Sequence, residues 1–70
     1  GLGVAVDKPA GAAWYRRAAR QGDEWACHLL GLCYRDGTGV RRNRATARRW
    51  FQKAAAKNVR EAAAALEKLG

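Results

Sequence analysis

Residues 37–55, GTGVRRNRATARRWFQKAA, repeat in outline the start of the chain, residues 1–19, GLGVAVDKPAGAAWYRRAA. When the sequence is shifted against itself by 36 residues, eight of the 34 overlapping positions are identical, and Trp14 falls on Trp50. A repeat period between about 20 and 50 residues is typical of solenoids, which are built from stacked units. We therefore predict a single domain that consists of two units, residues 1–36 and 37–70.

Apolar residues in each unit recur at the three- and four-residue intervals of an amphipathic helix. In the first unit they are Gly11, Trp14, Tyr15 and Ala18, and their equivalents are Ala47, Trp50, Phe51 and Ala54. No stretch alternates with the period of two that indicates a strand. We expect the aromatic side chains to fill the space between helix layers. Three small residues are expected to let neighbouring backbones approach: Ala26, Gly31 and Ala54.

Capping residues predict where the helices begin and end. Asp7, Asp23 and Asn43 have short side chains that accept hydrogen bonds from the amides of a first turn. Gly22 and Asn58 tolerate the left-handed conformation that ends a helix. The sequence therefore predicts an all-α chain with four helices, over residues 8–20, 24–35, 44–57 and 59–69.

This pattern resembles the Sel1-like repeat family, which is related to the tetratricopeptide repeats. The matching positions are Ala26, Leu30, Gly31, Tyr34, Gly37, Gly39, Val40, Asn43, Ala47, Trp50, Phe51, Lys53, Ala54, Ala55 and Ala62. The chain departs from the family pattern at Gly11, Asn43, Asn58 and Glu67. The resemblance covers essentially the whole chain. It implies a right-handed α-solenoid of stacked antiparallel helix hairpins, a protein-interaction scaffold and flanking repeats in the parent chain.

Composition and motifs argue against an enzyme or a cofactor-binding protein. The six acidic residues lie mostly at predicted helix ends, and no pair of them falls in an apolar setting that would shift a pKa. There is no glycine-rich phosphate loop. No apolar run reaches the ~18 residues that cross a bilayer. We therefore predict no catalytic residues, no cofactor and no membrane span.

Cys27, His28 and Cys33 are residue types that bind zinc, but they share one predicted helix. At ~100° per residue the two cysteines lie ~240° apart around that helix, so they do not converge on one metal ion or on each other. We therefore expect no metal site and two small buried side chains. The segment also looks like the cysteine-rich branch of the Sel1-like family. That resemblance implies no bridge within the repeat, because Ala19 occupies the position of the partner cysteine.

The leading candidate for a partner-binding surface is one face of the helix over residues 24–35. The side chains on this face are Trp25, His28, Leu32 and Arg35. The repeat does not require the two apolar ones, because the second unit has Glu61 and Lys68 at their positions. A bulky aromatic residue beside aliphatic and cationic groups is typical of an anchor for a protein or peptide. Packing against an upstream helix is the other interpretation.

The second candidate is basic. The net charge of +8 divides into +1 for residues 1–36 and +7 for residues 37–70. Five arginines fall within nine residues with no acid among them: Arg41, Arg42, Arg44, Arg48 and Arg49. Arginines near a helix N-terminus gain nothing from the macrodipole, so the alternative function is a module that binds nucleic acid or another polyanion. Variable surface positions without a function are the other interpretation.

A third hypothesis is a structural end cap without a ligand of its own. The last helix carries Glu61, Glu67 and Lys68, which suits an outer face that meets water. The helix over residues 8–20 has no preceding hairpin partner, so we expect it to pack on the second and third helices or to stay partly open. The sequence therefore predicts the C-terminal piece of a longer array. Its positive charge favours an acidic protein or peptide partner, and no residue shows which protein this is.

Overall fold

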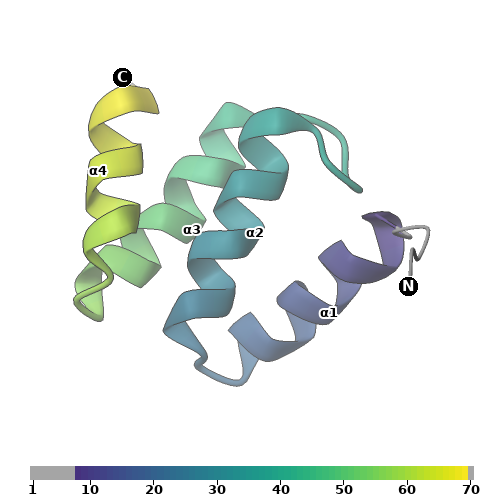
Figure 1. The fold of residues 1–70 in the computed structure, drawn as a ribbon, viewed down its shortest axis with the longest axis horizontal. Coiled ribbons are helices and arrows are strands. Elements are labelled where there is room, and N and C mark those ends of the chain that lie inside the picture. The colour runs from purple at the N-terminus through teal and green to yellow at the C-terminus, as the bar shows by residue number, and fades with distance from the viewer. Residues whose placement is uncertain (1–7, 70) are drawn as a thin grey trace.

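The computed structural model describes residues 8–69, with side chains from residue 10 onward, and contains four α-helices in this range. They are α1 (Lys8–Arg20), α2 (Glu24–Asp36), α3 (Arg44–Ala56) and α4 (Arg60–Leu69). Each predicted boundary is within one residue of the observed one. Consecutive helices run antiparallel (Figure 1), and the all-α solenoid fold is confirmed. None of the described helices is long and apolar enough to cross a membrane.

The helices begin and end at the predicted capping residues. Asp23 and Asn43 are the N-caps of α2 and α3, and each side chain accepts a hydrogen bond of 3.0 Å from the amide three residues later. Gly22 and Asn58 have φ angles of 96° and 72°, which is the left-handed conformation that stops α1 and α3. Asp7, the predicted cap of α1, lies outside the described residues. Local side-chain chemistry therefore sets these boundaries.

The core lies where α2, α3 and α4 meet. Phe51 of α3 and Leu30 of α2 are the largest fully buried side chains. Gly31 of α2 faces the Phe51 ring, and a Cβ atom at this position would lie 2.6 Å from two ring carbons. We predicted that Gly31 brings two backbones together. The structure corrects this detail, because the missing side chain makes room for an aromatic ring.

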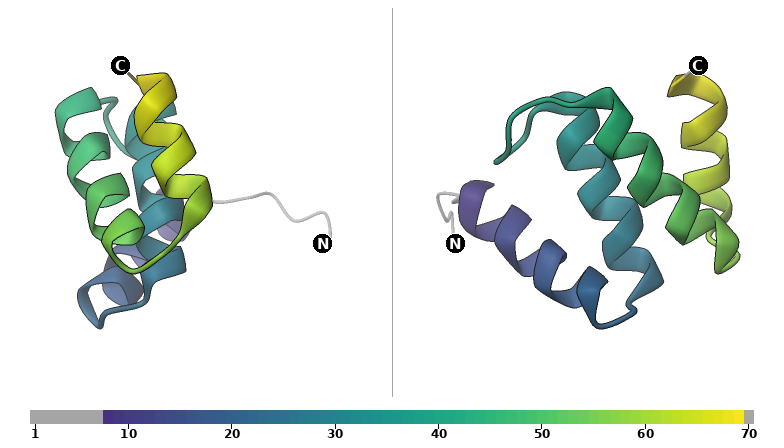
Figure 2. Two further views of the ribbon diagram at one scale, coloured as in Figure 1. Left: turned by 90° about the vertical axis from the view of Figure 1, so that its left-hand side faces the viewer. Right: turned by 180° about the vertical axis from the view of Figure 1, so that it is seen from behind.

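The prediction that Trp14 lies in the core is wrong, because 66% of its surface is exposed. α1 packs on α2 but, among the described residues, not on α3 (Figure 2). The side of α1 that faces α2 carries the buried residues Ala12 and Ala19, and Tyr15 packs partly against the core. Trp14 lies on another side of the helix, which none of the other three helices covers.

Both cysteines are free and buried in α2, which confirms their prediction as small core side chains. Burial raises the pKa of the Cys27 and Cys33 thiols. Ala19, at the position where the resemblance implied a partner cysteine, belongs to the same buried cluster as Cys27. Within the described part of the chain, no three His, Cys, Asp or Glu side chains gather where a metal ion could bind.

Candidate functional site

Trp25 is a large apolar side chain that stays exposed, with 47% of its surface open to solvent. It lies near the start of α2, and its ring centroid is 5.0 Å from that of His28 with a tilt of 43°. His28 in turn lies 5.7 Å from Phe51 with a tilt of 47°. Tilted pairs at these distances are favourable aromatic contacts. Three rings in tilted contact therefore connect the exposed indole to the centre of the core.

His28 is placed differently from our prediction. We assigned it to the binding surface, whereas only 6% of its surface is exposed and its ring lies between Trp25 and Phe51. His28 therefore packs beneath Trp25 and is too deeply buried to contact a partner itself. Among the described residues, no group hydrogen-bonds to its buried Nδ1 atom.

Burial lowers the pKa of His28, because the imidazolium loses hydration inside the protein. Glu61 of α4 acts against this shift, and Arg35 adds to it. The imidazole is therefore neutral at neutral pH. α4 begins at the same end of the stack as α2 (Figure 1), so Glu61 in its first turn lies at the end of α2 that carries Trp25.

The other two residues of the predicted face lie further along α2. Leu32 is partly buried and packs against the core. Arg35 makes two hydrogen bonds of 2.9 Å to the carboxylate of Asp36, one from Nε and one from a terminal nitrogen. These bonds, with the nearby charge of Arg42, lower the pKa of Asp36. The helix thus presents an aromatic end and a cationic end on one face.

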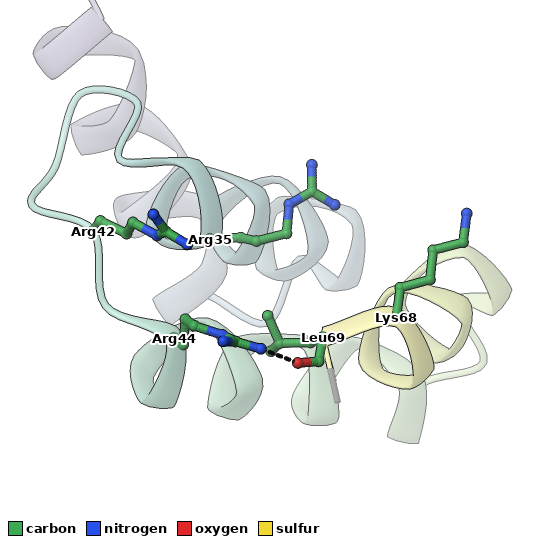
Figure 3. A pocket seen from close by; sticks show the side chains of 5 residues that line it. All are labelled: Arg35, Arg42, Arg44, Lys68 and Leu69. Atoms are coloured by element: carbon green, nitrogen blue, oxygen red, sulfur yellow. Dashed lines mark hydrogen bonds between the residues drawn. The ribbon is translucent and has the colours of Figure 1, made fainter.

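The cationic end of α2 opens into a pocket of about 280 Å³. It is lined by Arg35, Arg42, Arg44, Lys68 and Leu69 (Figure 3). These residues come from α2, from the connection between α2 and α3, from the start of α3 and from the end of α4. Figure 3 shows Arg35 and Lys68 extending to the same side from two different helices. We refer to the four cationic residues with Leu69 as the basic pocket.

The basic pocket differs from the basic site that the sequence indicated. Of the five predicted arginines only Arg42 and Arg44 line it, while Arg41, Arg48 and Arg49 are exposed elsewhere on the surface. Sequence reasoning missed the role of Lys68 and assigned Arg35 to the aromatic face alone. The antiparallel order of the helices was the available signal, because it brings the ends of α2 and α4 and the start of α3 to one edge.

Arg44 also has a structural role that the sequence analysis did not find. Its terminal nitrogen donates a hydrogen bond to the backbone carbonyl of Leu69, in the last turn of α4 (Figure 3). The carbonyls of a last turn have no partner within the helix and carry partial negative charge. Arg44 therefore gains nothing from the dipole of its own helix, α3, but stabilises the C-terminal end of the neighbouring helix α4.

A second exposed tryptophan marks a different surface. Trp14 lines a shallow pocket of about 240 Å³ on α1 together with Ala10, Ala13 and Arg17. The Arg17 guanidinium lies 5.5 Å from the centroid of the indole, within the range of a cation–π contact. The site that we derived from the sequence did not include these residues, because Trp14 was expected in the core.

Comparison with known proteins gives two matches. The chain matches the Sel1 repeat family over residues 1–23 and 26–59. It is also similar to a Sel1 repeat protein from Oxalobacter formigenes of known crystal structure, with 39% sequence identity and a TM-score of 0.91. The match covers 99% of this chain and 28% of the other one, so the chain spans less than a third of that relative. No curated protein matches the sequence.

Proposed function

Because the chain belongs to the Sel1 repeat family, we propose that it binds a peptide or a partner surface through the face of α2 that carries Trp25 and Leu32. Sel1 repeats generally mediate protein–protein interactions, and their fold is a non-catalytic scaffold. The observation that carries the proposal is the exposed indole of Trp25 held in place by a buried histidine. A rigid aromatic anchor loses little conformational entropy when it binds.

The repeat itself supports this choice of face. Glu61 of α4 occupies the position equivalent to Trp25, and it is exposed. Lys68 stands where α2 has Leu32. The stack therefore forms without apolar side chains at these positions, so folding alone does not account for Trp25. Aromatic residues that are exposed without a folding role are typical of interface hot spots.

His28 adds a second argument. A buried polar atom without a hydrogen-bond partner costs about 1–3 kcal/mol, and an apolar side chain of similar size would avoid this cost. Unsatisfied groups of this kind are uncommon in folded proteins. The His28 ring, which carries this nitrogen, has its centroid 5.0 Å from that of the proposed anchor, Trp25. Both features support the same location.

The test is a selection of binders from a random peptide library displayed on phage, with the purified chain as bait. Selected peptides are then measured by isothermal titration calorimetry against the wild type, Trp25→Ala and Trp14→Ala. Trp14→Ala is the matched control, because it removes an exposed tryptophan from α1. We expect Trp25→Ala to weaken binding at least about tenfold, as truncation of a hot spot does, while Trp14→Ala leaves the affinity unchanged.

Circular dichroism spectra of both variants establish that the helices are intact. If the peptides lose affinity with Trp14→Ala and keep it with Trp25→Ala, α1 is the binding face and the proposal is wrong. It is equally wrong if both variants bind as tightly as the wild type.

A further inference from the structure

We infer that the basic pocket receives the acidic side chains of the partner, so that the proposed binding face takes a segment with an apolar residue at one end and an acidic cluster at the other. This inference rests on the proposed function, because it names the chemistry of the partner for the same face. Arg35 lies on the proposed face and also lines the pocket, so the two share this residue.

The pocket holds more positive charge than the fold uses. Arg35 is paired with Asp36, and Arg44 is bonded to the carbonyl of Leu69. Within the described residues, Arg42 and Lys68 make no hydrogen bond or ion pair. The residues that line the pocket include four cations and no carboxylate. The nearby carboxylate of Asp36 interacts with Arg35 and Arg42. An anionic ligand would complete the charge balance.

The length of α2 sets the spacing of the ligand. Trp25 and Arg35 are ten residues apart on one helix, which corresponds to about 15 Å at ~1.5 Å per residue. An extended peptide advances ~3.3 Å per residue, so about four to five residues cover this distance. The expected segment therefore carries its apolar residue about four to five positions from its acidic residues.

The distribution of charge along the face favours an acidic peptide over a nucleic acid. Glu24 is next to Trp25 in the sequence, and Glu61 lies near His28, so the aromatic end is flanked by two carboxylates. A nucleic acid carries a phosphate at every nucleotide and would place negative charge at both ends of the face. A peptide can confine its charge to one end. The surface is therefore complementary to a segment with separated apolar and acidic parts.

The excess of charge also indicates more than one acidic side chain. Four cationic groups and one carboxylate leave an excess of three positive charges at the pocket, and a free chain terminus supplies only one negative charge. A volume of about 280 Å³ has room for side chains of a partner. We therefore assign the pocket to adjacent Asp or Glu side chains within a partner segment.

The test uses the peptides from the random library, synthesised with blocked termini. Arg42→Gln with Lys68→Gln removes two charges that make no described hydrogen bond or ion pair, and it leaves every described hydrogen bond in place. Arg41→Gln with Arg49→Gln is the matched control, because it removes the same charge from exposed positions outside the pocket. We expect the pocket variant to bind about tenfold more weakly and the control less than threefold, because only close charge pairs escape screening.

Three results would overturn the inference. The first is a set of Trp25-dependent peptides without enrichment of Asp and Glu, which leaves the proposed function intact and removes only the acidic partner. The second is an equal loss of affinity in the pocket variant and its control, or a requirement for a free terminal carboxylate. The third is a single-stranded DNA oligonucleotide that binds more tightly than the peptides and competes with them. If no peptide depends on Trp25, the proposed function fails with it.

Discussion

α1 and α3 carry the same apolar pattern 36 residues apart, yet most of the stripe on α3 is fully buried, whereas the stripe on α1 is only partly buried and exposes its tryptophan. On α3, Ala47, Phe51 and Ala54 have no exposed surface. On α1, Trp14 is two-thirds exposed, although it is the equivalent of the partly buried Trp50. The pattern thus predicts a helix and an apolar stripe. It does not predict how much of the stripe is covered.

The neighbours of the two helices explain the difference. α3 packs on α2 and on α4, whereas α1 packs on α2 alone among the described helices (Figure 2). The buried side of α1 includes Ala19, which is the equivalent of Ala55 on α3. α1 therefore has a neighbour only in the next helix along the chain, whereas α3 packs between the preceding helix and the next one.

The largest expected loss of stability comes from removing the aromatic ring at the centre of each apolar stripe, Phe51 on α3 and Tyr15 on α1. Phe51→Ala removes a fully buried ring and should cost about 3–5 kcal/mol of unfolding free energy. A chain of this length has a total stability of roughly 4–10 kcal/mol, so the variant should be largely unfolded at moderate urea concentrations. Tyr15→Ala, at the equivalent position of α1, should cost less than half as much. Urea titration followed by circular dichroism measures both, and equal losses would contradict the comparison.

The two tryptophans give the next largest difference. Trp50 packs partly against the core, and the Lys53 ammonium lies 4.7 Å from its ring centroid. Trp50→Ala should therefore cost about 1–3 kcal/mol, while Trp14→Ala should stay within about 0.5 kcal/mol, as expected for an exposed position. Thermal unfolding of both variants provides the measurement. A Trp14 variant as unstable as the Trp50 variant would show that the α1 stripe is covered in solution.

Two small substitutions at equivalent positions of α1 and α3 should change the stability in opposite directions. Beyond its chain neighbours and the backbone of its own helix, no atom lies within 4 Å of the position that a Cβ at Gly11 would take. Gly11→Ala should therefore stabilise α1 by about 0.5–1 kcal/mol. Ala47→Gly, at the equivalent buried position of α3, should destabilise by about 1–2 kcal/mol, because helix propensity and a buried methyl group are both lost. Chemical denaturation measures both changes. Two changes of the same sign would break the comparison.

The parts of the fold that were predictable from sequence are those that local chemistry determines. Asp23 and Asn43 cap their helices through a side chain and an amide three residues away, and Gly22 and Asn58 stop helices through their own backbone conformation. None of these features needs a distant residue. The burial of Phe51 is different, because it depends on the two helices that pack on α3, and Tyr15 at the equivalent position of α1 is only partly buried.

The candidate site was predictable only in part, because it depends on contacts between distant residues. Trp25 could be proposed as a binding residue from the sequence, because the second unit has Glu61 at the equivalent position. The burial of His28 follows from the Phe51 ring, 23 residues away, which periodicity along one helix does not report. The basic pocket joins Arg35 to Lys68 across the stack, whereas the run of arginines in the sequence pointed to a different group. The basic residues that cluster in the sequence are therefore not the same residues as those that cluster in space.

The smallest expected effect is the pH dependence of stability, which probes the side of α2 that faces α3. Burial holds the pKa of His28 below its usual value of 6.5, so the unfolded chain binds a proton more readily than the folded one. Stability should therefore fall as the pH decreases below about 6.5 and be unaffected by this group above it. His28 is the only histidine of the sequence, so the window between pH 5 and 7 reports mainly on this residue.

The variant His28→Leu should remove the dependence of stability on pH in this window. It should also raise stability at pH 7, because no buried nitrogen is left unpaired. Urea titrations across this window measure both, and a slope that persists in the variant would show that another group carries it.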